Sequence, residues 1–277
     1  MQDQSKSKDF QKIDLKQVFA SKSDKVAKLI PGFLISYLKR IIHQDELNDF
    51  LSRNHQKQGI DFAQSVLDEL SINFETEGLE KLDNEKRYLF VANHPLGGPD
   101  GMILISIFGK YFKSIRFLVN DILMNVENLK NVFVPINKHG GQAKEAAKMI
   151  ESAYKSDSTI LTFPAGLVSR KQQGKIEDLE WKKSFVMKAK KHHRDIVPIH
   201  ISGRNSNFFY NLANFRKFIG LKANIEMLYL VNELYKQRGR NFKIKVGEPI
   251  PYESLDRSLN HNQWAKKIKK QCYDLAD

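Results

Sequence analysis

Short apolar runs alternate with longer segments of helical periodicity through the middle of the chain. The short runs are typical of buried strands, and the longer segments repeat apolar residues every three or four positions. We expect strands at 88–92, 115–119, 131–136, 159–163 and 196–201, and helices at 100–111, 142–155, 178–192 and 206–219. This alternation favours an α/β fold with a largely parallel sheet flanked by helices.

The segments outside this alternation have other patterns. Residues 45–70 have the apolar spacing of helices, and residues 72–82 form a short connection with the character of a strand and turn. After the alternation we expect a strand pair at 224–231 and 241–247, and then a basic helix at 261–275.

A chain of 277 residues can hold one large domain with a helical appendage. No internal repeat, low-complexity tract or long linker interrupts it. We therefore divide it into two parts. We expect residues 1–75 to be a polar segment and a helical region, a candidate for membrane association, and residues 76–277 to form the main domain.

The segment after the first apolar run carries the clearest chemical signal. Tyr88–Ala92 ends abruptly at Asn93 and His94, and two prolines and two adjacent glycines then lead to Asp100. A histidine at a strand end can accept a proton near neutral pH, and a carboxylate at the next helix start can fix its tautomer. The same residues also fit a loop with an incidental histidine, and Asp100 also fits a plain helix N-cap.

Three later segments extend this signal. They are Asn131-Val-Phe-Val-Pro-Ile-Asn-Lys138, Leu161-Thr-Phe-Pro-Ala-Gly166 and Ile196-Val-Pro-Ile-His-Ile-Ser-Gly203. In this order and spacing, the four segments resemble the sequence blocks of the glycerolipid acyltransferase family, which includes the 1-acylglycerol-3-phosphate acyltransferases and related haemolysin-like bacterial enzymes. The resemblance extends over residues 89–203.

The resemblance implies that His94 is the general base and Asp100 its partner. It also implies a set of substrate-binding residues, namely Asn93, Gly97, Gly98, Lys138, Phe163, Pro164, Ala165, Gly166, Ser169 and Arg170. Lys138 is the best candidate for binding the acceptor's anionic headgroup, and a surface lysine at a strand end is the alternative. Arg170 either contacts a carboxylate or phosphate of a substrate or belongs to a solvated basic loop.

The chain departs from the family pattern at three places. His94 and Asp100 are separated by one residue more than usual, which Gly97 and Gly98 can absorb because glycine adopts backbone conformations closed to other residues. Ala165 stands where the family has glutamate, and Lys138 stands where it has arginine, which loses the planar fork suited to phosphate. These departures favour a branch that acylates a lyso-aminolipid, such as a lyso-ornithine or lyso-glycine lipid.

The reaction that the resemblance implies is acyl transfer from an acyl thioester, on acyl carrier protein or coenzyme A, to the hydroxyl of a lyso-lipid. It implies no bound cofactor and no metal. The lyso-lipid acceptor, the thioester donor and an anionic membrane surface are the expected partners, and we expect no nucleic-acid partner. The expected location is peripheral, on the cytoplasmic face of a bacterial inner membrane.

The formal net charge of +13 indicates an acidic partner. Lysines and arginines are dense at residues 236–245 and 266–270, but no nucleic-acid-binding module is recognisable. An anionic membrane surface is therefore the better explanation. Phe33–Ile42 is apolar with Lys39 and Arg40 near its end, which fits either an interfacial segment or an ordinary amphipathic helix.

Two other observations limit the alternatives. Cys272 is the single cysteine, so an intrachain disulfide and a cysteine-based metal cluster are excluded, and no stretch is long and apolar enough for a transmembrane helix. A catalytically silent lipid-binding protein remains an alternative that the retained His94 and Asp100 disfavour. A nucleic-acid-binding protein is a weaker alternative, which predicts strongly salt-dependent binding.

Overall fold

The computed structural model of the chain describes residues 12–15, 17, 31–136 and 142–276. Within these residues, seven strands form one sheet in the order β1-β9-β8-β2-β5-β3-β4. The strands of the sheet are β1 (Asn73–Glu77), β2 (Tyr88–Ala92), β3 (Ile115–Asn120), β4 (Phe133–Ile136), β5 (Thr159–Thr162), β8 (Asp195–Ile201) and β9 (Asn241–Val246). A separate hairpin consists of β6 (Arg170–Gln172) and β7 (Lys175–Glu177).

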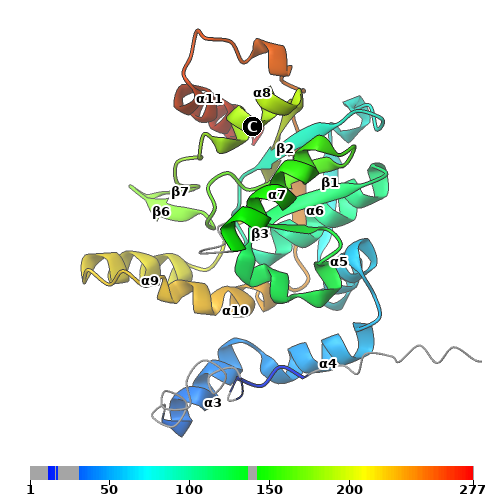
Figure 1. Cartoon of the computed structure of the whole chain (residues 1–277). Coiled ribbons are helices and arrows are strands. Elements are labelled where there is room, and N and C mark those ends of the chain that lie inside the picture. The colour runs from blue at the N-terminus through cyan, green and yellow to red at the C-terminus, as the bar shows by residue number, and fades with distance from the viewer. Residues whose placement is uncertain (1–11, 16, 18–30, 137–141, 277) are drawn as a thin grey trace, which may run out of the picture.

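Neighbouring strands of the sheet are parallel except β8 and β9, which pair antiparallel. The helices are α3 (Gly32–Ile41), α4 (Gln44–Asn54), α5 (Gly59–Glu69), α6 (Gly98–Tyr111), α7 (Gln142–Lys155), α8 (Ser184–His192), α9 (Asn207–Phe218), α10 (Leu230–Tyr235) and α11 (His261–Asp274). The α8 and α11 helices lie at one end of the molecule, and α3 and α4 lie at the other (Figure 1). The predicted α/β fold with a largely parallel sheet is confirmed.

The central strand β2 shows why this sequence forms a layered fold. Successive side chains of a strand point to opposite faces of the sheet. Tyr88 and Phe90 accordingly join the core under α5 and α6, whereas Leu89 and Val91 join the core under α7, α8 and α11. Every residue of β2 is buried, as expected for a parallel strand covered on both faces.

The structure corrects two of the expected elements. Residues 224–231 are not a strand: they form the 3₁₀ helix η4 (Ile225–Tyr229) and the start of α10. Glu226 and Glu233 are buried there beside charged or polar partners, which a strand at the sheet edge would not provide. The helix expected at 178–192 begins only at Ser184, because the loop before it is held by a hydrogen bond from Trp181 Nε1 to the Asp178 carboxylate.

The N-terminal helices lead into the sheet without a break in the core. Phe62 and Leu67 of α5 are buried in the same cluster as Phe90 of β2. The division at residue 75 falls within β1 and remains a prediction. No helix among the described residues has the length and apolar character needed to cross a bilayer.

Cys272 offers a test of how α11 packs. Its side chain is fully buried, its Sγ donates to the Ile199 carbonyl oxygen at 2.9 Å, and burial raises the pKa of the thiol. Because the thiolate is the reactive form, we expect Ellman's reagent to label the native protein at least about 10²-fold more slowly than the unfolded chain, since labelling requires opening of α11. Absorbance at matched pH measures both rates, and immediate labelling of native protein would contradict this packing.

Candidate active site

His94 and Asp100 meet at the carboxyl end of β2. His94 is the second residue after the strand, and Asp100 lies in the first turn of α6. The His94 Nδ1 and Asp100 Oδ2 atoms are 2.8 Å apart. Asp100 is fully buried, whereas the His94 side chain keeps 17% of its surface exposed. The pair therefore combines a fixed inner carboxylate with an imidazole that a substrate can reach.

The hydrogen bonds of Asp100 determine the tautomer of His94. Asp100 Oδ2 also accepts hydrogen bonds from the backbone N–H groups of Leu96, at 2.9 Å, and Gly97, at 3.0 Å. The oxygen is thus an acceptor, so Nδ1 carries the ring proton and Nε2 keeps its lone pair. The amino end of α6 adds a positive dipole that suits the carboxylate.

Gly97 takes up the extra residue between His94 and Asp100. Its φ is 94° and its ψ is −117°, a conformation that side chains with a Cβ rarely adopt. A Cβ there would also come within 3.2 Å of Leu230 Cδ2. Helix α10 therefore packs directly over this loop, and exposed Gly98 then begins α6.

Phe163 forms one wall of the site. It follows β5, the strand beside β2, and its ring stacks on the His94 imidazole with centroids 3.9 Å apart and planes inclined by 11°. On its other side it packs against Phe117 at 5.1 Å. This contact fixes the plane of the imidazole and places an apolar surface next to Nε2.

The turn after Phe163 brings a cation to the same edge. The N–H of Gly166 donates to the Phe163 carbonyl, and the Pro164 carbonyl accepts from the N–H of Lys182 at 3.1 Å. Ala165 is buried, and Gly166 is exposed with a φ of 71°. The Lys182 ammonium lies against Gly166, where a Cβ would come within 3.1 Å of it. Sequence reasoning missed Lys182, which lies between the third and fourth family-like blocks.

Asn93 and Ser169 hold the backbone of the site rather than line it. The Asn93 amide donates to the Ile201 carbonyl at 2.9 Å and accepts from the Ile201 N–H at 2.7 Å, so it joins the ends of β2 and β8. The Ser169 N–H donates to the His94 carbonyl at 2.7 Å. Both residues are buried, so their predicted contact with substrate stays a prediction.

Asp178 is a further support that the sequence did not reveal. One of its oxygens accepts from the backbone N–H of His94 at 3.1 Å and from the Ser169 hydroxyl at 2.6 Å, and the other accepts from Trp181 Nε1 at 2.9 Å. Burial raises the pKa of Asp178, although these donors oppose the shift. Asp178 is far from His94 in the sequence, so these hydrogen bonds form only in the tertiary structure.

Arg170 belongs to a buried ion cluster. Its guanidinium donates to Glu226 Oε1 at 3.0 Å and to the Val168 carbonyl at 2.7 Å, and the second partner of Glu226 is Arg216, at 2.6 Å. Arg170 is 1% exposed, so the alternative of a solvated basic loop is wrong. The geometry gives Arg170 a structural role behind the site, and a direct substrate contact remains a prediction.

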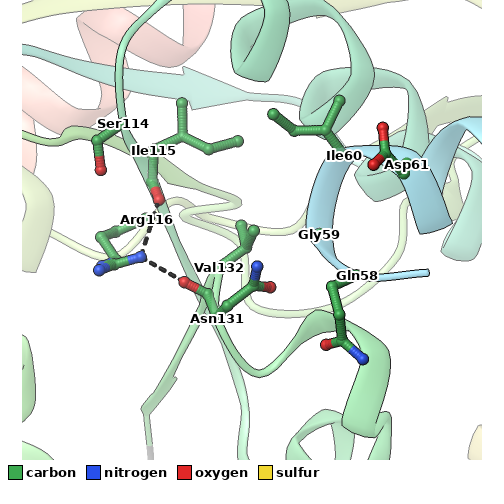
Figure 2. A pocket seen from close by; sticks show the side chains of 9 residues that line it. All are labelled: Gln58, Gly59, Ile60, Asp61, Ser114, Ile115, Arg116, Asn131 and Val132. Atoms are coloured by element: carbon green, nitrogen blue, oxygen red, sulfur yellow. Dashed lines mark hydrogen bonds between the residues drawn. The ribbon is translucent and has the colours of Figure 1, made fainter. Parts of the chain in front are cut away.

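Lys138 lies outside the described residues. Among the residues that the structure does describe, no group of three or more His, Cys, Asp or Glu side chains is placed to share a metal ion. A hollow of about 240 Å³ lies at the amino end of β3, where Arg116 donates to the Ile115 and Asn131 carbonyls (Figure 2). It is at the sheet edge opposite His94, so it is separate from the His94–Asp100 pair.

Asp100→Asn tests the contribution of the carboxylate. A hydrogen bond to a charged group contributes about 1.5–3 kcal/mol, which corresponds to about 10–10²-fold in rate. We expect the variant to lose that factor in turnover at nearly unchanged acceptor KM, because Asp100 contacts His94, the predicted base, rather than a substrate. Steady-state kinetics measure the split, and a rise in KM alone would contradict the role of Asp100 as a positioning residue.

Known proteins resemble this chain over most of its length. The sequence profile of the family described as "Acyltransferase" matches residues 17–277. A lyso-glycine lipid O-acyltransferase of Phocaeicola vulgatus is 48% identical over 264 residues, covering 95% of both chains. A second protein of that name, from Bacteroides thetaiotaomicron, is 47% identical over 264 residues, covering 95% of this chain and 97% of its own.

Among solved structures, the 1-acyl-sn-glycerophosphate (LPA) acyltransferase PlsC of Thermotoga maritima matches with a TM-score of 0.45 and 18% identity, covering 88% of this chain and 92% of that one. The family profile and the two relatives confirm the resemblance of the four sequence blocks. The chain therefore belongs to the acyltransferase family, together with these two relatives named lyso-glycine lipid O-acyltransferases, and is an acyltransferase enzyme.

Proposed function

We propose that the protein transfers a fatty acyl group from an acyl thioester to the hydroxyl of a lyso-aminolipid. The observation that carries this proposal is the His94–Asp100 pair, whose 2.8 Å bond leaves the lone pair of Nε2 available at the carboxyl edge of the sheet. The names of the two relatives add the acceptor class, because both are called lyso-glycine lipid O-acyltransferases.

In the proposed step, His94 Nε2 removes the proton of the acceptor hydroxyl as the oxygen attacks the thioester carbonyl carbon. The new C–O bond forms and the C–S bond breaks. The imidazolium returns the proton to the departing sulfur, so the products are an ester and a free thiol. Asp100 stabilises the imidazolium through Nδ1, in the manner of the third group of a catalytic triad.

The acceptor site supports a headgroup other than phosphate. Ala165 is buried in the turn where the family has a glutamate, so this turn offers no carboxylate to the acceptor. Lys138 replaces the arginine suited to bidentate phosphate binding. A lyso-glycine lipid has a headgroup that ends in a carboxylate. A single lysine cation suits this carboxylate better than it suits a phosphate.

The proposed donor is the thioester of acyl carrier protein or coenzyme A. Both are acidic, and the net charge of +13 and the ammonium of Lys182 favour an anionic donor at this edge. We further propose that the protein acts peripherally at the cytoplasmic face of the inner membrane, since its acceptor resides in a bilayer and its charge attracts anionic lipid.

The test offers purified protein a labelled acyl donor together with lysophosphatidate, lyso-ornithine lipid and lyso-glycine lipid in parallel. Each acceptor is paired with acyl-coenzyme A and with acyl carrier protein, and products are separated by thin-layer chromatography. We expect the diacyl product from lyso-glycine lipid to exceed the others by at least about tenfold. Preferred acylation of lysophosphatidate would overturn the acceptor assignment.

A further inference from the structure

Large apolar side chains gather at the carboxyl end of α9 and in the turn after it. Phe218 is 88% exposed, Phe215 is 58% exposed, Ile219 is 54% exposed and Leu221 is 38% exposed. We call residues 215–222 the α9 tip. Helix α9 extends away from the sheet, so the tip is a protruding feature (Figure 1). Exposed apolar patches of this kind mark surfaces that contact a partner or a membrane.

The exposed charged side chains of the α9 tip are both basic. Lys217 and Lys222 are exposed within it. The sequence contains no acidic residue from Ile196 to Ile225. Aromatic and aliphatic side chains flanked by lysines are the composition of segments that lie in a bilayer interface, where the rings enter the headgroup region and the ammonium groups meet anionic lipid.

The α9 tip is fixed to the catalytic loop by buried contacts. Arg216, within the tip, pairs with Glu226, and Glu226 pairs in turn with Arg170. Arg170 follows Ser169, whose N–H bonds to the His94 carbonyl. The position of the tip relative to His94 is therefore set by an ion cluster inside the protein.

A second connection runs through α10. The side chain of Leu230 lies over Gly97, and that of Leu234 lies over Gly98. The element that follows the tip therefore covers the loop between His94 and Asp100. A bilayer held at the α9 tip would have a defined distance and orientation to the catalytic pair.

We propose that the α9 tip docks the enzyme on an anionic lipid surface, with Phe215 and Phe218 in the interface and Lys217 and Lys222 at the headgroups. This inference rests on the proposed function, in which the acceptor is a membrane lipid. The bilayer is favoured over a protein partner because the tip is convex and its most exposed side chains are apolar.

The first experiment measures co-sedimentation of the full chain with phosphatidylcholine vesicles that contain or lack phosphatidylglycerol. We expect Phe215→Ser/Phe218→Ser to bind at least about tenfold more weakly, because each phenylalanine loses its interfacial burial. Lys217→Gln/Lys222→Gln should weaken binding about tenfold only when phosphatidylglycerol is present. Met187→Ser, which changes a 47% exposed methionine on α8, is the matched control and should bind like wild type.

A second measurement reports insertion directly. In Phe218→Trp, we expect the added tryptophan emission to shift to shorter wavelength with vesicles and to be quenched by brominated phosphatidylcholine, relative to wild type, whose Trp181 and Trp264 are buried. Unchanged vesicle binding of the double phenylalanine variant, or absence of quenching, would overturn the proposal. So would binding of the tip to acyl carrier protein in place of vesicles.

Activity separates this inference from the proposed reaction. Phe215→Ser/Phe218→Ser should acylate a short-chain lyso-aminolipid dispersed as monomers at the wild-type rate, but lose at least about tenfold on the same headgroup presented in vesicles. If wild type acylates neither presentation, the proposed reaction fails while the vesicle-binding result still stands. Equal loss on both presentations would contradict a docking role.

Discussion

His94→Ala is expected to lower the rate of acyl transfer by about 10²–10⁴-fold, the usual contribution of a general base. The Nε2 lone pair is the group that takes the hydroxyl proton, and alanine cannot replace it. Asp100 is not placed to substitute, because its side chain is fully buried behind His94. The loss should appear in turnover, with the acceptor KM little changed.

The measurement is the appearance of free thiol from the donor, together with mass spectrometry of the lipid product. The stacking of His94 on Phe163 also contributes to packing, so thermal unfolding should be compared for His94→Ala and His94→Gln. His261→Ala, at an exposed histidine at the start of α11, is the matched control and should retain full activity. A His94→Ala rate within threefold of wild type would refute the proposed mechanism.

Glu226→Gln is expected to lower the free energy of unfolding by about 3–5 kcal/mol, because it leaves two buried guanidinium groups without their carboxylate. Glu226 is fully buried between Arg170 and Arg216. Burial alone would raise the pKa of Glu226, but the hydrogen bond from Arg216 and the charges of both arginines lower it below the usual value. The carboxylate is therefore ionised and stabilising at neutral pH.

The depressed pKa gives this stability a pH dependence of known sign. Because the folded-state pKa lies below the unfolded value, the contribution of Glu226 is fully present above that unfolded value of about 4.5 and is lost as the pH falls towards the folded value. The free energy of unfolding of wild type, measured with urea, should thus decrease as the pH falls over this range. The same free energy for Glu226→Gln should depend less on pH. Identical slopes for the two proteins would contradict the assignment.

Two controls isolate the buried cluster. Asp274→Asn breaks the exposed pair with Lys270 and should change stability little, because solvent screens such pairs. Adding Arg216→Met to Glu226→Gln removes one of the unpaired charges and should restore part of the lost stability. An additive loss in the double variant would show that Arg216 and Glu226 do not interact.

The sheet could be predicted from the sequence because its signal is local. The apolar run at β2 is buried on both faces, and its boundaries coincide with those expected. The prediction of a strand at 224–231 was wrong because the structure of this segment depends on contacts with distant residues. Its apolar residues flank a single carboxylate, Glu226, and that carboxylate is buried because it pairs with Arg170 and Arg216 from other parts of the chain.

The candidate site likewise has a part that is local in the sequence and a part that depends on long-range contacts. His94 and Asp100 are six positions apart, so a strand end, a glycine turn and a helix start bring them together within one local unit. Ser169 and Arg170 also stood out in the sequence, but their burial shows them supporting the catalytic loop. Nothing in the sequence near Asp178 indicates that it holds the backbone of His94, since that contact spans 84 positions.

The sequence by itself determined the parallel α/β sheet, the histidine–carboxylate pair and the family, because hydrophobic periodicity and a compact motif are properties of neighbouring residues. Only the tertiary structure decided which polar residues became buried supports and which apolar residues stayed exposed at the α9 tip. Burial depends on what the rest of the chain packs against each side chain. The same arginine or phenylalanine can therefore line a core or face a membrane.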